Sequence, residues 1–350
     1  MIDTFHRIRA LHDSGVKIHM HCFEYGRPHS DFLSTLCSTV NYYPRRRGLI
    51  YQFSLVPYCV ITRHNVNLLD DLIRDDHPLF FDGLQVTYLL GHRLLAGRKK
   101  IVRLHNREDE YYRKLAGFEN NPFKKIYYLL ESYKLKWHEK ILRKAQILMP
   151  ISGDDNKYYT FRYGKSEMVL PFHPFDKVES RSGSGEYILF HADLSVNENR
   201  VIARYLVNEV FSGSDFRFII AGKKPPGDLV KLVSYHRNIE LIPDPDQERM
   251  IDLIGNAHIN ILPSFSSQGM KLKLILSLYK GRHCLVNRLM AAGTWLEPVC
   301  VIADSSEEFK DKVRELMKMP FTGEMISGRI RVLQLYYNNN LNAKIIADLI

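Results

Sequence analysis

The chain has 350 residues, of which 45% are hydrophobic and 25% charged, so its composition excludes a disordered chain and its length fits two domains. The formal net charge of +10 favours an acidic partner such as a sugar nucleotide, an anionic membrane surface or a nucleic acid. Five scattered cysteines argue against a disulfide framework, and no apolar run is long enough to span a membrane. We therefore expect a soluble protein, or at most a peripheral one, in the reducing cytoplasm.

The first half of the sequence alternates between helical and strand patterns. A helix is predicted over Ile2–Ser14, ending at Gly15, and a strand follows at Val16–Phe23. Further strands are predicted at Leu84–Leu90, Lys100–His105 and Gln146–Ile151, and helices at Ser54–Asp75 and Asn121–Ala145. An α/β domain rarely starts on a helix, because a strand and a glycine-rich turn normally come first. We expect that this first strand is missing or that the true start lies upstream.

A polar stretch rich in Ser and Gly, Asp176–Glu186, is interpreted as a linker. The predicted division is therefore an N-terminal domain over 1–174, a linker over 175–186, a second domain over 187–325 and two C-terminal helices over 326–350, broken near Asn338. The second domain has predicted strands at Tyr187–Phe190, Phe216–Gly222, Ile239–Ile242, His258–Leu262, His283–Asn287 and Val299–Ala303, with helical patterns between them. The predicted fold class is α/β, with two Rossmann-like doubly wound domains that face a cleft.

The segment Pro263–Gly281 contains an almost wholly apolar helix whose start carries Lys271 and Lys273. A helix that is apolar all round should be buried. Cations in the first turn oppose the helix dipole by about 0.3–1 kcal/mol each, and a bound phosphate would reverse that sign. The alternative is that both ammonium groups reach solvent on their aliphatic stems.

Three other polar loops follow predicted strands, and polar groups at the carboxyl ends of parallel strands mark a ligand site. His105 ends one strand and could contact a substrate, although a structural role is equally open to any one of fifteen histidines. Ser195–Asn199 follows another strand, where helix capping is the alternative to ligand contact. Lys223 stands in a third loop, for which a plain turn is the favoured interpretation.

The region Gly91–Lys144 carries fifteen Lys or Arg residues among several tyrosines and one tryptophan. Such a basic aromatic surface suits an anionic membrane interface or an RNA, while a solvated helix face with buried tyrosines is the commoner origin. No RNA-binding motif accompanies it, so no nucleic acid is expected as a partner. Walker-A, intact dinucleotide-binding and zinc-binding signatures are also missing from the sequence.

These residues resemble the retaining, nucleotide-sugar-dependent glycosyltransferases of family 4, which have the two-domain GT-B fold. The resemblance is carried by Leu194-Ser195 with Asn199, the Ile219–Lys223 strand and turn, the Asn256–Ser264 strand and loop, and Lys273–Gly281 in that order. In the first half, Val102-Arg-Leu-His105 resembles the strand whose terminal histidine lines the active site.

The resemblance implies a hexosyltransferase that passes a sugar, with retention, from a nucleoside-diphosphate sugar to a glycan or lipid-linked acceptor. It implies no cofactor and no metal, a catalytic His105, and docking on an anionic membrane through Arg98–Lys144. The implied donor-binding residues are Ser195, Glu198, Asn199, Lys223, Ser264, Gln268, Gly269, Lys271 and Lys273.

The sequence departs from the family's pattern at the donor site. Asp193 and Glu198 stand where the family has an arginine and a lysine on the diphosphate, and its pair of glutamates falls on Gln268 and Leu276. Two charge reversals beside a phosphate would cost several kcal/mol of affinity if nothing compensated. Either Lys271, Lys273 and Lys223 have taken over the diphosphate, or the chain is a degenerate relative that serves as a binding or scaffold protein.

Overall fold

The computed structural model describes residues 2–26, 28–119, 121–265 and 271–350, and the second half of the chain contains a six-stranded parallel sheet. Its strands are β6 (Ile188–Asp193), β7 (Phe218–Lys223), β8 (Ile239–Pro243), β9 (Ile259–Ile261), β10 (His283–Val286) and β11 (Val301–Ile302). Each overlaps a strand predicted from the sequence, which confirms those predictions. The apolar runs were informative because parallel strands are buried on both faces.

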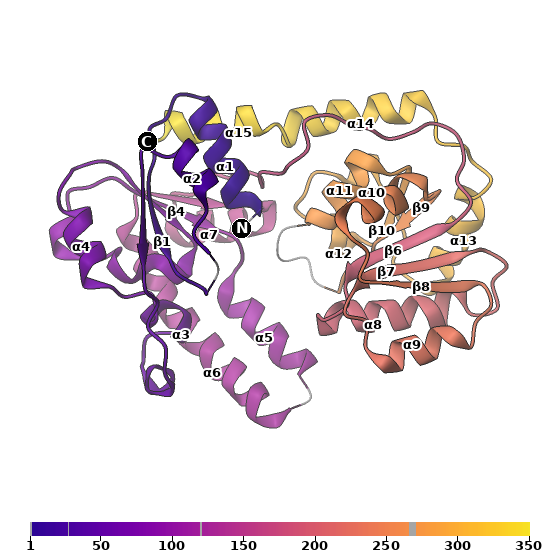
Figure 1. The fold of residues 1–350 in the computed structure, drawn as a ribbon, viewed down its shortest axis with the longest axis horizontal. Coiled ribbons are helices and arrows are strands. Elements are labelled where there is room, and N and C mark those ends of the chain that lie inside the picture. The colour runs from indigo at the N-terminus through magenta and orange to yellow at the C-terminus, as the bar shows by residue number, and fades with distance from the viewer. Residues whose placement is uncertain (1, 27, 120, 266–270) are drawn as a thin grey trace. The chain divides into compact units, whose positions relative to one another are not determined.

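Helices connect the strands of this sheet, as expected for right-handed parallel crossovers (Figure 1). The helices between the strands are α8 (Asn197–Tyr205), α9 (Gly227–Ser234), α10 (Gln247–Asn256), α11 (Leu272–Lys280) and α12 (Arg288–Ala291). Two more helices, α13 (Ser306–Leu316) and α14 (Gly323–Tyr336), follow the last strand, β11. Helix α8 continues as a π-helical turn, η5 (Leu206–Phe211), and a short 3-10 turn, η6 (Glu297–Val299), precedes β11. The result is a Rossmann-like unit.

The strand order β11-β10-β9-β6-β7-β8 reverses direction next to β6. The chain runs from β6 through β7 to β8 on one side, and β9 then pairs with the other side of β6. Loops that leave adjacent strands in opposite directions open a crevice at the carboxyl ends of those strands. The loops after β6 and β9 therefore occupy the position where doubly wound sheets bind ligands.

The first half of the chain contains smaller parallel sheets. One has the order β3-β4-β5, with β3 (Leu79–Asp82), β4 (Lys100–Leu104) and β5 (Ile147–Pro150), and the other pairs β1 (His19–Phe23) with β2 (Thr39–Tyr43). The α-helices are α1 (Ile2–Asp13), α2 (Asp31–Leu36), α3 (Tyr58–Ile61), α4 (Val66–Leu72), α5 (Glu108–Phe118), α6 (Pro122–His138) and α7 (Gly153–Tyr163). The 3-10 turns are η1 (Leu49–Phe53), η2 (Leu84–Leu89), η3 (Arg93–Leu95) and η4 (Glu139–Lys144).

Two predictions for the first half are wrong. Leu84–Leu90 is the 3-10 turn η2 rather than a strand, and the Thr87 hydroxyl donates to the carbonyl oxygen of Leu84 within it. The strand is the preceding Leu79–Asp82, which pairs with β4. Ser54–Asp75 is not one helix, because α3 ends at Ile61 and α4 begins only at Val66, after the capping residue Asn65.

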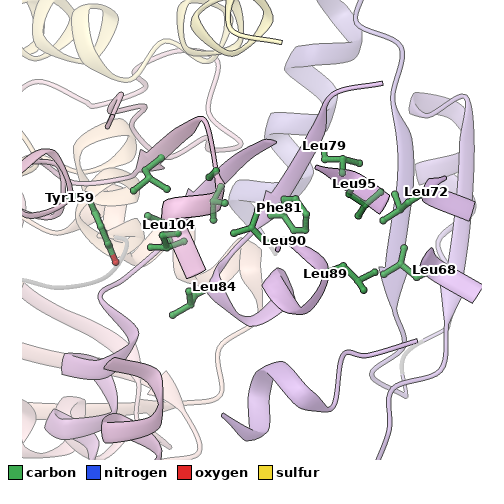
Figure 2. Packing of buried hydrophobic residues seen from close by; sticks show 14 of the residues in the cluster. Leu68, Leu72, Leu79, Phe81, Leu84, Leu89, Leu90, Leu95, Leu104 and Tyr159 are labelled. Carbon is green, nitrogen blue, oxygen red and sulfur yellow. The ribbon is translucent and has the colours of Figure 1, made fainter. Parts of the chain in front are cut away.

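Figure 2 shows the main apolar cluster of the first half, in which leucines from α4, η2 and β4 pack around Phe81. A second cluster joins α1 to the last helix, α15 (Asn339–Asp348), through Ala10, Leu11, Ala343 and Ile346. In the second half the core includes Leu189 of β6 and Ile219 of β7.

The described residues form two compact units. Unit 1 contains 2–174 and 337–350, and unit 2 contains 175–265 and 271–336. The two C-terminal helices are present as predicted, with α14 in unit 2 and α15 in unit 1. Asn338 is the N-cap of α15, because its side-chain oxygen accepts hydrogen bonds from the backbone N–H groups of Asn340 and Leu341. Among the described residues, the chain passes from unit 1 to unit 2 after Pro174 and back to unit 1 after Tyr336.

Candidate functional site

Glu198, in the first turn of α8, connects the loop after β6 to the loop after β9. Its carboxylate oxygen Oε1 accepts hydrogen bonds from the Ser264 hydroxyl at 3.3 Å and the Phe265 backbone N–H at 3.2 Å. On the other side, the Ser264 backbone N–H donates to Asn287 Oδ1 at 2.9 Å, and Asn287 Nδ2 donates to the Ser264 carbonyl at 2.7 Å. The start of the loop after β9 is thereby fixed at the point where the strand order reverses.

Lys273 of α11 lies against the same two loops. Its ammonium nitrogen is 3.5 Å from Asn199 Oδ1 and 5.6 Å from the centre of the Phe190 ring. Burial lowers the pKa of Lys273 to about 8, although the negative charge of Glu198 opposes the shift. A cation with a depressed pKa has less stabilisation than it would have in water, so a nearby anion would favour its charged form.

Lys271 is the residue before α11 and is buried, and its carbonyl accepts the first hydrogen bonds of the helix from Leu274 and Ile275. The interpretation that both ammonium groups reach solvent does not fit this burial. The prediction that the helix itself is buried is confirmed for Leu274, Ile275 and Leu278.

The C-terminal end of α11 is held by a buried arginine from α14. Arg329 donates to the carbonyls of Leu278 at 3.2 Å and Gly281 at 2.6 Å. A guanidinium at this position satisfies carbonyls that have no partner within the helix, and its charge complements the helix dipole. The helix that presents Lys273 is therefore anchored at its far end.

His191 of β6 adds a further contact between the sheet and α11. Its Nε2 is 2.8 Å from the Ser277 hydroxyl. Burial and then the charge of Lys273 lower the pKa of His191 to about 3, so the imidazole is neutral at physiological pH. It packs α11 onto β6 without adding a charge.

The loop after β6 is organised by Asp193. Its Oδ1 accepts from both the backbone N–H and the hydroxyl of Ser195, at 2.9 and 2.6 Å, and its carbonyl accepts from Asn199 Nδ2 at 2.8 Å. The hydrogen bond from Ser195, followed by Lys223 and Lys224, lowers the pKa of Asp193. The capping alternative for Ser195 or Asn197 is wrong, because Val196 precedes the first turn of α8 and no side chain caps it.

Lys223 ends β7 directly beside Asp193 and is exposed. Gly222 lies so close to the backbone of β6 that an added Cβ would be 2.0 Å from the Ala192 carbonyl oxygen. Lys224 follows in a left-handed conformation with φ of 51°, and its N–H donates to Asp244 Oδ1. The favoured interpretation of this segment as a tight turn is therefore correct, and the turn presents Lys223 next to the loop after β6.

The structure thus brings together Glu198, Asn199, Ser264 and Lys273, with Ser195 and Lys223 on neighbouring strand ends. Gln268 and Gly269 lie outside the described residues. Leu276, which stands in the place of a glutamate in the resembled family, is half-buried and packs with the core cluster around Ile254. Its side chain has no polar atom that could bind a ribose.

In unit 1, His105 follows β4 and bonds to Asp82, at the end of the adjacent β3. His105 Nε2 is 2.8 Å from Asp82 Oδ1, while Asp82 Oδ2 accepts from the Thr4 hydroxyl at 2.7 Å and from Arg7 at 2.8 Å. Burial would raise the pKa of Asp82, but Arg7 and His105 outweigh it and hold that pKa well below its ordinary value. The ionised carboxylate orients the imidazole.

Asp3 extends this network inward. Its carboxylate accepts from Arg7 at 2.8 Å, from Arg103 at 3.0 Å and from the Phe172 backbone N–H at 2.8 Å. Burial would raise its pKa, but Arg103 and Arg7 lower it. Asp3, Asp82 and His105 are close enough to share a metal ion, yet Arg7 bonds to both carboxylates and supplies the positive charge there. A cation bound between these carboxylates would be repelled by the guanidinium of Arg7.

Asp82 and Glu108 were not among the site residues predicted from the sequence. Asp82 could have been found from the strand signal Leu79-Phe-Phe81 before Asp-Gly, but that run has only three apolar residues. Glu108 begins α5 close to His105, and burial raises its pKa to about 7 while His105 opposes the shift. A carboxyl group that titrates near neutral pH beside a strand-end histidine is a candidate for proton transfer.

No protein-family model matches the chain. An uncharacterised 44.6 kDa protein in the cps region of Klebsiella pneumoniae is 26% identical over 293 residues, which cover 78% of this chain and 74% of that protein.

Several solved structures are similar to this chain in fold. Sucrose-phosphate synthase from Thermosynechococcus elongatus superposes with a TM-score of 0.67 at 12% identity, covering 98% of this chain and 90% of that one. TarM superposes with a TM-score of 0.62 at 14% identity over 83% of this chain, which spans only 57% of TarM. A variant of Staphylococcus aureus TarM was crystallised with fondaparinux, α-GlcNAc-glycerol and UDP. The chain therefore has the GT-B glycosyltransferase fold of two Rossmann-like domains.

Proposed function

We propose that the protein is a glycosyltransferase that moves a hexose from a nucleoside-diphosphate sugar to a glycan or lipid-linked acceptor. The observation that carries the proposal is the desolvated Lys273 ammonium at the point where the strand order of unit 2 reverses. That position binds ligands in doubly wound sheets, and the negative charge of a diphosphate would favour the charged form of Lys273 beyond what Glu198 provides.

The donor roles follow from where the polar groups lie. Lys273, Lys271 and Lys223 would neutralise the diphosphate, and Ser264 would line the same loop. Glu198 already holds the loop after β9 and lies near Lys273, which offsets the repulsion that its carboxylate would exert on a phosphate. Asn199, Gln268 and Gly269 complete the proposed donor site, and Ser195 shapes it through Asp193.

The chemistry proposed here is transfer with retention and without a metal. Cationic side chains stabilise the charge that develops on the leaving diphosphate as its bond to the sugar breaks. His105, oriented by Asp82, would contact the sugar near the reacting carbon. A TarM variant of the same fold was crystallised with UDP, which supports this assignment by analogy. The support is only an analogy, because a shared fold does not fix the reaction.

The alternative is a catalytically degenerate GT-B protein that serves as a scaffold in glycan assembly. Asp193 and Leu276 favour it, because one places a negative charge and the other an apolar side chain at the donor site. We rank it second because the lysine-rich start of α11 has no comparable explanation in a scaffold. In either case we propose a cytoplasmic protein, peripheral to the inner face of the membrane.

A thermal-shift panel of nucleoside diphosphates tests the proposal. A transferase should be stabilised by one of them, since a ligand that binds only the folded state adds RT ln(1 + [L]/Kd) to its stability. Lys271→Ala should then weaken that nucleotide's binding at least tenfold in calorimetry. If no nucleoside diphosphate shifts the melting temperature, the donor site is refuted and the scaffold is favoured.

A further inference from the structure

The 3-10 turn η1 of unit 1 presents apolar side chains to solvent. Leu49 is 74% exposed, Ile50 76%, Phe53 87% and Leu55 91%. Scattered exposed leucines are ordinary in soluble proteins, whereas here four large apolar side chains are exposed within seven residues. Arg47 lies immediately before them and is also exposed. These four side chains belong to neither apolar cluster of unit 1.

Helix α6 carries a second exposed apolar stripe. Phe123 is 82% exposed, Ile126 56%, Leu130 58%, Tyr133 71% and Trp137 64%. These residues recur at alternating intervals of three and four, so they lie along one face of the helix. In a globular protein that face normally packs on the core, whereas here the core contact is made by Leu135 and Glu131 on another face. The apolar stripe of α6 is turned outward.

The two features adjoin. Lys134 of α6 donates from its ammonium group to the carbonyl of Gln52 in η1 at 2.8 Å, and Glu131 of α6 accepts from the Tyr58 backbone N–H at 2.7 Å. In Figure 1 the loop that carries η1 and the helix α6 project from the same end of unit 1. We call this combined surface, made of Leu49–Leu55 and the outward stripe of α6, the docking face.

The exposed charged residues of α6 and η4 are all basic. Lys124, Lys125 and Lys136 are exposed on α6, and Lys140 is exposed in η4 just beyond it. The two acidic residues of this segment, Glu131 and Glu139, are buried, at 1% and 3% exposure. The face is therefore apolar and cationic. A second copy of the chain is a poor occupant, because a symmetric contact would bring the lysines of the two copies together.

We propose that the docking face binds the surface of an anionic lipid bilayer, with the apolar tips in the interfacial region and the lysines among the headgroups. Apolar aromatic side chains bordered by lysines are the composition of helices that lie in the membrane plane. Among the described residues, no helix is both long and apolar enough to cross a bilayer, so this attachment is peripheral. The proposal does not depend on the donor site of unit 2.

Vesicle sedimentation with the full chain tests it. Wild-type protein should sediment with vesicles of phosphatidylcholine and phosphatidylglycerol, and at least tenfold less with phosphatidylcholine alone. The double variant Phe53→Ser, Leu55→Ser should lose at least tenfold in binding, because it removes two inserted side chains. Lys124→Glu with Lys125→Glu should lose as much and should remove most of the salt dependence.

Matched controls lie on unit 2. Tyr235→Ser removes an aromatic side chain that is 68% exposed, and Lys231→Glu with Lys318→Glu makes the same change in net charge as the α6 double variant. Both should bind vesicles like the wild type, and all variants should keep the wild-type melting temperature. The proposal fails if the wild type does not sediment with anionic vesicles, or if the control variants lose as much vesicle binding as the docking-face variants. It also fails if F53S/L55S binds vesicles like the wild type and only lowers the molecular mass measured by light scattering, which would show that the face joins two copies of the chain.

Discussion

Lys273 of α11 and Asn199 of α8 meet at 3.5 Å, between nitrogen Nζ and oxygen Oδ1, although 74 positions separate them in the chain. Each residue follows a different strand, β9 and β6, which are neighbours only because the strand order reverses there. Among the described residues, the Asn199 oxygen and the nearby charge of Glu198 do not offset the cost of burial, which lowers the pKa of Lys273. The contact therefore lies where we propose that the diphosphate of the donor binds.

Lys273→Met should weaken the binding of a nucleoside diphosphate at least tenfold, because it removes the desolvated cation and keeps the aliphatic stem. Isothermal calorimetry measures the effect. Lys280→Met is the matched control on the same helix, since Lys280 is paired with Glu179 at 2.7 Å at the far end of α11. Equal losses in the two variants would contradict the assignment.

The affinity for a nucleoside diphosphate should fall as the pH rises through about 8, where the free protein loses the proton of Lys273. Below that pH the cation is present and binding is constant, while above it affinity should fall by up to about tenfold per pH unit. Titrations between pH 7 and 9 measure the slope. In Lys273→Arg the slope should vanish, because a guanidinium stays charged throughout this range.

His105→Ala should abolish sugar transfer and leave the binding of the nucleoside diphosphate unchanged, because His105 belongs to unit 1 and the donor site to unit 2. Asp82→Asn keeps the shape of the side chain that orients His105 and should lower the rate less than the loss of the imidazole does. A radiolabelled sugar assay beside calorimetry separates the two effects. Full turnover by H105A would refute the catalytic role.

Asp3→Ala should destabilise the protein by about 3–5 kcal/mol, since it leaves the buried guanidinium groups of Arg7 and Arg103 without their shared carboxylate. The free energy of unfolding in urea measures the loss. The exposed Asp13, 4.0 Å from Arg9 on the same helix, provides the comparison. Asp13→Ala should cost less than about 1 kcal/mol.

Glu108 should make the folded state less stable as the pH rises from 4.5 to about 7. Over this range the folded protein keeps a proton that the unfolded chain has already lost, so raising the pH favours unfolding. Glu108→Gln removes that contribution. The difference in unfolding free energy between wild type and E108Q should therefore change across this window, and a constant difference would show that the carboxyl group titrates normally.

The strands of unit 2 could be predicted from the sequence because β7, β9 and β10 are almost wholly buried and therefore appear as apolar runs. In unit 1 the apolar run Leu84–Leu90 was wrongly predicted to be a strand, because a buried 3-10 turn and a buried strand have similar compositions over so few residues. The short strand β3 was not predicted, because its apolar run, Leu79-Phe-Phe81, has only three residues.

The loops of the candidate site could be placed at strand ends, but their partners could not. His105 pairs with Asp82 and Glu198 with Ser264 across 23 and 66 positions. These contacts depend on which strands are neighbours, and no local pattern encodes strand order. The alternation of strands and helices predicts that such loops gather, whereas the sheet decides which side chains touch.

The helix α15 has a consequence for the order of folding. It packs on α1 within unit 1, yet it follows the whole of unit 2 in the chain. On the ribosome, all of unit 2 has been synthesised before Ala343 and Ile346 become available to cover Ala10 and Leu11. The N-terminal unit, usually the first to fold during synthesis, is here the last that can complete its core.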